Sequence, residues 1–173
     1  MKTIDNINFE GERVVIRVDY NVPIDENRKI TDSTRINASK ETISRVIEKG
    51  GKVILLTHLG RPKGFDSKLS CSIIVDEVSK ILGKKVFFCN STIGINAESD
   101  VKKLLPGEII LMENVRFFSE ETDGNENFAE QLSRLGTVYI NDAFGTAHRA
   151  HASTTIIAQF FRKKYFGKLL EKE

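Results

Sequence analysis

The chain has 173 residues, of which 40% are hydrophobic and 29% are charged, and its formal net charge is +2. These values are typical of one ordinary soluble globular domain and by themselves indicate no preference for nucleic acid or membranes. Residues 1–13 carry charges of both signs and no apolar stretch, which excludes a signal peptide, and no apolar run approaches the roughly 20 residues that a membrane helix needs.

Five short segments along the chain are rich in apolar and β-branched residues. They lie at 13–18, 52–57, 85–88, 108–112 and 137–140. Their apolar residues run almost continuously instead of alternating with polar ones. This pattern predicts strands that are buried on both faces of a parallel sheet.

Segments with helical periodicity separate these strands. They cover 36–47, 74–82, 97–105 and 128–135, and each is closely followed by a glycine or a proline. The alternation predicts an α/β fold, an open parallel three-layer αβα sandwich of the Rossmann-like kind, in a single domain. Residues 155–161 fit either a strand or a helix, and residues 166–173 indicate a helix that starts near the end of the chain.

Two cysteines are present, Cys71 and Cys89, and they form no CxxC pair. The expected state is two buried thiols in a reducing cytoplasm, although the sequence leaves a disulfide open.

Charged side chains gather after the predicted strands, where ligands bind in open α/β sheets. The cations expected along this edge are Arg35, His58, Arg61, Lys63, Arg116, His148, Arg149 and His151. The acids there are chiefly Asp19, Glu113 and Asp142. Because the planar guanidinium group holds phosphate or carboxylate through two hydrogen bonds, the excess of cations predicts a site for a small anion with several negative groups.

Each of these residues also has a plainer structural interpretation. An arginine after a strand can be solvated or ion-paired, Asp19 and Asn21 can form a turn, and Asp142 can cap a helix or pair with an arginine. His148 and His151 have a spacing that suits metal ligands on a helix, but no third ligand stands out. The sequence has no P-loop, dinucleotide fingerprint, GxSxG elbow or HExxH motif, so nothing in it would cradle ATP.

Five motifs on the predicted edge occur together, in this order, in one known family. They are RVDYNVP at 17–23, DSTRI at 32–36, HLGRPKG at 58–64, ENVRF at 113–117 and DAFGTAHRAHAS at 142–153. Together they resemble the N-terminal domain of phosphoglycerate kinase, and the resemblance extends through 166–173. It implies that residues 1–153 form the phosphoglycerate-binding domain, that residues 154–173 begin the interdomain connection, and that the C-terminal nucleotide-binding domain is absent.

The resemblance implies reversible phosphoryl transfer between ATP and 3-phosphoglycerate, which yields 1,3-bisphosphoglycerate and ADP in glycolysis. ATP or ADP with Mg²⁺ would be bound by the missing domain, and no cofactor or metal by this chain. The expected partners are the substrate and the enzyme's own C-terminal domain, without nucleic acid or membrane. We expect a cytoplasmic monomer that is inactive without its other half.

Roles for individual residues follow from the same resemblance. Arg35 is the expected catalytic residue, which stabilises the phosphoryl group during transfer. The residues expected to bind the substrate are Asp19 and Asn21 (backbone and hydroxyl), His58, Arg61, Arg116 and Arg149 (non-transferred phosphate), Arg35, and His148 nearby. No general base is expected, because the acceptor is a carboxylate that is already ionised at neutral pH.

The chain departs from the family pattern at two places, and alternatives to the kinase remain. Tyr20 stands where the family usually has phenylalanine, and Lys40 and Glu41 replace a common Leu-Pro pair. A stand-alone anion-binding module that has lost catalysis would show the same motifs, and the codons after Glu173 would distinguish it. Nucleic-acid binding by the basic edge is a third possibility, testable by the salt dependence of affinity.

Overall fold

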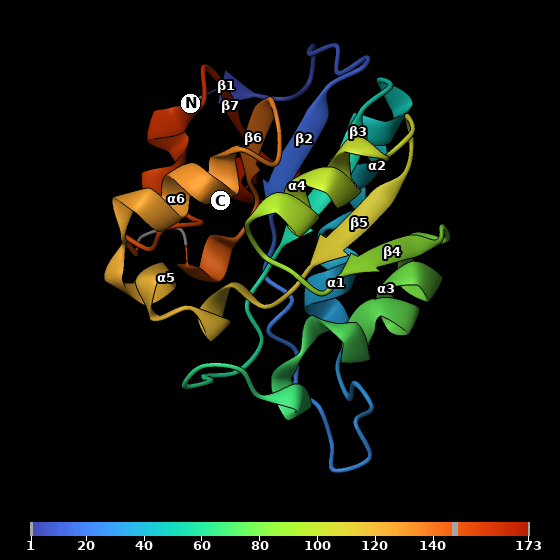
Figure 1. Cartoon of the computed structure of the whole chain (residues 1–173). Coiled ribbons are helices and arrows are strands. Elements are labelled where there is room, and N and C mark those ends of the chain that lie inside the picture. The colour runs from blue at the N-terminus through green and yellow to red at the C-terminus, as the bar shows by residue number, and fades with distance from the viewer. Residues whose placement is uncertain (1, 147–148, 173) are drawn as a thin grey trace.

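The computed structural model describes residues 2–146 and 149–172 and contains one parallel sheet at its centre (Figure 1). The strand order is β1-β7-β6-β2-β3-β5-β4, and all neighbouring strands are parallel. The strands are β1 (Lys2–Thr3), β2 (Arg13–Arg17), β3 (Lys52–Leu56), β4 (Val86–Cys89), β5 (Ile109–Met112), β6 (Val138–Asn141) and β7 (Lys163–Phe166). All five predicted strands are confirmed, and each lies within two residues of its predicted position.

Helices cover both faces of the sheet, which confirms the predicted open three-layer αβα arrangement. They are α1 (Thr34–Ala38), α2 (Lys40–Glu48), α3 (Val75–Leu82), α4 (Ile95–Lys102), α5 (Ser119–Asp123), α6 (Glu126–Ser133) and α7 (Lys168–Glu171). Helices α1, α2 and α3 share one apolar core with the sheet, whereas α4 and α6 share the other. In Figure 1, α4 and α6 lie in front of the sheet.

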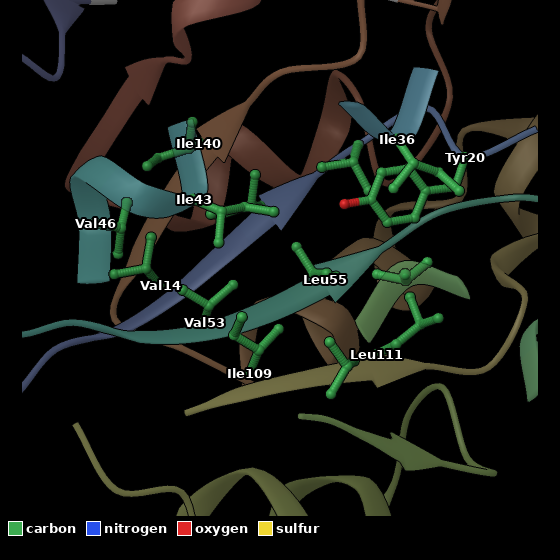
Figure 2. Close-up of a cluster of buried hydrophobic side chains, with 14 of the residues drawn as sticks. Val14, Tyr20, Ile36, Ile43, Val46, Val53, Leu55, Ile109, Leu111 and Ile140 are labelled. Atoms are coloured by element: carbon green, nitrogen blue, oxygen red, sulfur yellow. The ribbon is translucent and has the colours of Figure 1, made fainter. Parts of the chain in front are cut away.

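The two cores follow from the alternation of side chains along each strand. In β2, Val14 and Ile16 contribute to the core under α1 and α2, while Val15 contributes to the core under α4 and α6. Leu55 of β3 lies at the centre of the first core, fully buried (Figure 2). Truncating such a leucine to alanine typically costs about 2–5 kcal/mol, so packing in these cores contributes strongly to the stability of the sheet.

The first predicted helix is interrupted, because the structure ends α1 at Ala38 and starts α2 at Lys40. The Ser39 hydroxyl donates to the Ile36 carbonyl oxygen at 2.7 Å and lies 2.6 Å from the buried Tyr20 hydroxyl. A serine side chain that bonds its own backbone competes with helical hydrogen bonds. Tyr20 therefore has a polar partner at this helix junction.

The sequence pattern does not predict strands β1 and β7, and at residues 155–161 it fits either a strand or a helix. The structure gives the latter a 3₁₀-helix, η5 (Ile156–Phe160). Strand β7, with the sequence KKYF, is only partly buried, and β1 is two exposed residues long. Neither shows the continuous apolar pattern by which the central strands are recognised.

Cys71 and Cys89 are both buried free thiols, as expected. Within residues 2–146 and 149–172, no helix combines the length and the apolar character required of a membrane span.

Candidate anion-binding site

The polar loops after β2, β3, β5 and β6 all leave the same edge of the sheet, which we call the carboxyl edge. Arg17, the last residue of β2, is in register with Leu56 at the end of β3 and with Asn141 at the end of β6. Parallel pairing therefore brings the three following loops side by side. In Figure 1 this edge faces the lower part of the view, where the loops after β2 and β3 gather.

The loops after β2 and β3 are joined by direct hydrogen bonds. The Gly60 N–H donates to Asn21 Oδ1 at 2.8 Å, and the Tyr20 N–H donates to Thr57 Oγ1 at 2.9 Å. Gly60 has a φ of +65°, and a Cβ there would lie 2.8 Å from Leu69 Cδ2. Only glycine fits this position without strain, so the sequence itself fixes how the HLGRPKG loop approaches Asn21.

Arg35 of α1 reaches across to the loop after β2. Its Nη1 donates to Asp19 Oδ1 at 3.2 Å and to the Asn21 carbonyl oxygen at 2.9 Å, while half of the side chain remains exposed. Asp19 Oδ1 also accepts from the Asn21 N–H at 3.1 Å. On the other side of Asp19, a Cβ added to Gly145 would lie 2.9 Å from Asp19 Oδ2, so the loop after β6 closes on this carboxylate.

The buried side chain of Asn114 ties the loop after β5 to the loop after β3. Its Nδ2 donates to the carbonyl oxygens of Leu59 and Leu69 at 2.8 and 3.0 Å. Its Oδ1 accepts from the Arg116 N–H at 3.0 Å, which starts the 3₁₀-helix η3 (Val115–Phe117). Arg116 is thereby held beside the HLGRPKG loop.

A cavity of about 480 Å³ opens between these two loops. Its lining residues are Arg61, Pro62, Lys63, Gly64, Arg116, Phe118, Ser119 and Thr122. Arg116 Nε is buried and has no hydrogen-bond partner within the described residues. Burial lowers the pKa of Arg116, and the positive charges of Arg17, Arg149 and Arg61 lower it further. The cavity is therefore walled by cations that repel one another and hold an unused donor, which suits an anion.

His58 lies at the same edge and is only 3% exposed. Burial, and then the charges of Arg17 and Arg116, lower the pKa of His58 from 6.5 to about 2. It is therefore neutral at physiological pH. Among the expected cations, His58 contributes hydrogen bonding and not charge.

The acids predicted at this edge are largely engaged elsewhere. Glu113 is buried and accepts from Ser70 Oγ at 2.6 Å and from the Cys71 N–H at 2.8 Å. Asp142 Oδ1 accepts from the Leu169 N–H at 3.0 Å in the first turn of α7, which is the capping role considered for it. Burial raises the pKa of Asp142 to about 6. The edge therefore keeps an excess of positive charge.

The structure places the predicted site residues in two adjoining groups. Asp19, Asn21 and Arg35 form one, through the hydrogen bonds above. The other contains His58, Arg61, Arg116 and Arg149, which are linked through the electrostatic effects of their neighbours on Arg116 and His58. Arg61, Lys63 and Arg149 are exposed. His148 lies outside the described residues.

Two buried charged residues of the site were not predicted. Arg17 is fully buried, with its Nη2 3.0 Å from His58 Nδ1, and Glu121 of α5 lies 4.0 Å from the same Arg17 nitrogen. Arg17 belongs to the RVDYNVP motif, but no role was expected for it. A signal was available, because a charged residue that ends a buried strand between Ile16 and Val18 needs a buried partner.

Comparisons with known proteins give one consistent family. The model of the family "Phosphoglycerate kinase" matches residues 4–173. The chain is 46% identical to the phosphoglycerate kinase of Gloeobacter violaceus, over 99% of this chain and 43% of that protein. It is also 46% identical to the chloroplastic phosphoglycerate kinase 2 of Arabidopsis thaliana, over 98% of this chain and 36% of that protein.

Solved structures of similar fold come from the same family. The phosphoglycerate kinase from Pyrococcus horikoshii superposes with a TM-score of 0.89 at 32% identity, covering 99% of this chain and 44% of that one. The enzyme from Coxiella burnetii gives a TM-score of 0.86 at 36% identity, covering 98% and 42%. The chain thus spans less than half the length of these relatives and corresponds to their N-terminal part. This 173-residue chain belongs to the phosphoglycerate kinase family.

Proposed function

We propose that this chain is the 3-phosphoglycerate-binding part of a phosphoglycerate kinase, and that the cations of the carboxyl edge hold the substrate. The observation that carries the proposal is the group of cations Arg61, Lys63 and Arg116 that lines the 480 Å³ cavity. Burial first, and then repulsion from neighbouring arginines, lowers the pKa of Arg116 there. An anion with a phosphate and a carboxylate brings two negative groups to these cations and so reduces their repulsion. Arg61, Arg116 and Arg149 then bind the phosphate that is not transferred.

Asp19, Asn21 and Arg35 form the second half of the proposed site. The substrate's carboxylate is the phosphoryl acceptor, and with a pKa of about 4 it needs no general base. The chemical difficulty is to bring two anions together and to stabilise a loose, highly charged transition state. Arg35 is half exposed and already oriented by Asp19 and the Asn21 carbonyl, so we assign it the stabilisation of the phosphoryl group.

The described residues of this chain do not fit a nucleotide-bound Mg²⁺. Within them, no three His, Cys, Asp or Glu side chains gather as a metal-binding group, and Glu113 and Asp142 are engaged in hydrogen bonds to backbone N–H groups. We therefore derive no step through the metal or the nucleotide. The chain alone is proposed to bind 3-phosphoglycerate without turnover.

Residues 154–173 are proposed to begin the connection to the remainder of the enzyme. Helix α7 is held against the domain because Lys168 Nζ donates to Asp5 at 2.6 Å and Lys172 Nζ donates to Glu41 at 2.8 Å. These ion pairs fix the direction in which the chain leaves the sheet.

Isothermal titration with 3-phosphoglycerate tests the proposal. We expect a Kd between about 10 μM and 1 mM for the chain. Arg116→Met should weaken binding about 10- to 100-fold, because it removes a charged hydrogen-bond donor but keeps the apolar stem. Arg134→Met is the matched control, since Arg134 is exposed and paired with Glu130, and it should change the affinity less than about twofold. Equal effects of the two substitutions would refute the assignment.

A further inference from the structure

A buried polar network lies directly behind the proposed site and centres on Arg17. Its Nε donates to Ser153 Oγ at 2.7 Å, its Nη1 donates to the Val18 carbonyl oxygen, and its Nη2 lies 3.0 Å from His58 Nδ1. The Arg17 side chain is completely buried. Each of the three guanidinium nitrogens therefore has a defined partner, and the orientation of the group is fixed.

The hydrogen bond from Arg17 determines which ring nitrogen of His58 carries the proton. A guanidinium group has only N–H donors and keeps its charge in proteins, so His58 Nδ1 must be the acceptor of the 3.0 Å hydrogen bond. A ring nitrogen that accepts cannot also carry a proton. Nε2, which is the other ring nitrogen, therefore carries the proton of the neutral imidazole.

The charge balance of the network also favours an uncharged His58. Glu121 is fully buried, accepts from the Ser153 N–H at 2.9 Å and from Ser153 Oγ, and lies 4.0 Å from Arg17 Nη2. One buried cation and one buried carboxylate make the network neutral only while His58 is uncharged. A protonated His58 would place a second cation 3.0 Å from Arg17, away from water.

Other charged groups around His58 add to this effect. Arg116 in η3, Arg35 in α1 and His151 in the segment after β6 each disfavour a positive charge on His58, in addition to Arg17 at the end of β2. Glu121 in α5 is the opposing acid, and it is engaged by Ser153 and Arg17. Arg17 is the charged neighbour with the largest effect and the one that contacts the ring.

We propose that Arg17 is a positioning residue that fixes His58 as the neutral tautomer with its proton on Nε2, and that Ser153 and Glu121 hold Arg17 in place. The site then contains one directed N–H donor whose charge does not change with pH, among arginines that supply the charge. An unrestrained histidine would instead gain a positive charge as the pH falls through about 6.5. The tautomer follows from the geometry alone, whereas its use in binding 3-phosphoglycerate rests on the proposed function.

The tautomer can be measured on the unsubstituted chain. Long-range ¹H–¹⁵N correlation spectra of the ¹⁵N-labelled chain distinguish protonated from unprotonated ring nitrogens, and the chain has only three histidines. The signals of His58 are assigned by their loss in His58→Gln. We expect a protonated Nε2, an unprotonated Nδ1 and no titration from about pH 8 to about pH 5. A proton on Nδ1, or a titration near pH 6.5, would overturn the proposal.

Substitutions then separate positioning from a merely structural role. In Arg17→Met, burial still lowers the pKa of His58, but we expect that pKa to rise because the charged neighbour with the largest effect is gone and Glu121 remains. Arg17→Lys keeps the charge and a donor, and should restore a non-titrating ring. Arg13→Met is the matched control, since Arg13 begins the same strand and donates to the Leu135 carbonyl oxygen, far from the site. If Arg17→Met does not fold, Arg17→Met with Glu121→Gln removes both buried charges. In that variant His58 should stay neutral, but its proton should appear on Nδ1 as well as on Nε2, as a mixture of the two tautomers, because no donor then fixes Nδ1 as an acceptor.

Titration with 3-phosphoglycerate tests whether the protonation state of His58 affects binding. Relative to the unsubstituted chain, the affinity of Arg17→Met should rise about 3- to 10-fold between pH 7 and pH 5.5, as His58 gains a charge. A folded Arg17→Met chain whose His58 stays neutral and whose relative affinity is independent of pH would overturn the positioning role. Absence of binding by a chain with the expected tautomer would instead contradict the proposed function and leave the tautomer assignment in place.

Discussion

The two edges of the sheet differ in whether their cations form ion pairs. At the edge where the strands begin, two exposed cations are paired with acids: Lys163 lies 3.1 Å from Glu12, and Arg134 lies 2.8 Å from Glu130. Among the arginines predicted to bind the substrate at the carboxyl edge, and within the part of the chain that the structure describes, Arg61, Arg116 and Arg149 form no ion pair, whereas Arg35 is paired with Asp19. The difference supports the proposal that the unpaired arginines of the carboxyl edge are available to a ligand.

The largest difference is expected between a buried and an exposed ion pair in their contribution to the free energy of unfolding. Glu121→Gln should reduce the free energy of unfolding by about 3–5 kcal/mol, because Arg17 would be left buried without its opposite charge. The matched change Glu130→Gln breaks an exposed pair with Arg134 and should cost less than about 1 kcal/mol. Urea unfolding of both variants measures the two values. Similar losses would show that Arg17 does not depend on Glu121.

The pH dependence of stability sharpens the comparison at His58. The folded chain holds the pKa of His58 at about 2, while an unfolded histidine titrates near 6.5. Below pH 6.5 the unfolded state therefore binds more protons, so this contribution is complete above pH 6.5 and is lost as the pH falls. Between pH 7 and pH 5 the loss should be about 2 kcal/mol.

The measurement is urea unfolding of the chain and of His58→Gln at several pH values. Glutamine can still accept a hydrogen bond from Arg17 but cannot titrate, so the difference between the two curves isolates His58. Asp142 acts in the opposite direction between about pH 4 and pH 6, since burial raises its pKa to about 6. Its contribution cancels in the difference. A difference that does not change with pH would contradict a buried, neutral His58.

The central fold could be predicted because its signals are local. Strands such as β3, KVILL, have continuous apolar runs and end at the polar loops of the site. Strand β7 could not be predicted, because Lys163 and Lys164 resemble a solvated segment and the strand exists only through its pairing with β6. At the break between α1 and α2, Ser39 is hydrogen-bonded to the hydroxyl of Tyr20, a tertiary partner that periodicity does not reveal.

The position of the candidate site could be predicted from the sequence, but the buried network that supports it could not. The rule that ligands bind beyond the carboxyl ends of parallel strands was enough to group Asp19, His58 and Arg116. The supporting network was missed, because Glu121 belongs to the sequence SEETD, which resembles an exposed acidic helix. Its carboxylate is buried and accepts from Ser153, a residue 32 positions away in the sequence.

Mapping the bound substrate on the backbone tests the central claim most directly. ¹H–¹⁵N spectra of the labelled chain recorded during titration with 3-phosphoglycerate report on every backbone N–H. We predict saturable shifts at Gly60, Arg116 and Arg149, and unchanged signals at Glu12 and Arg134. Shifts that are absent at the carboxyl edge, or equally large at both edges, would contradict the account.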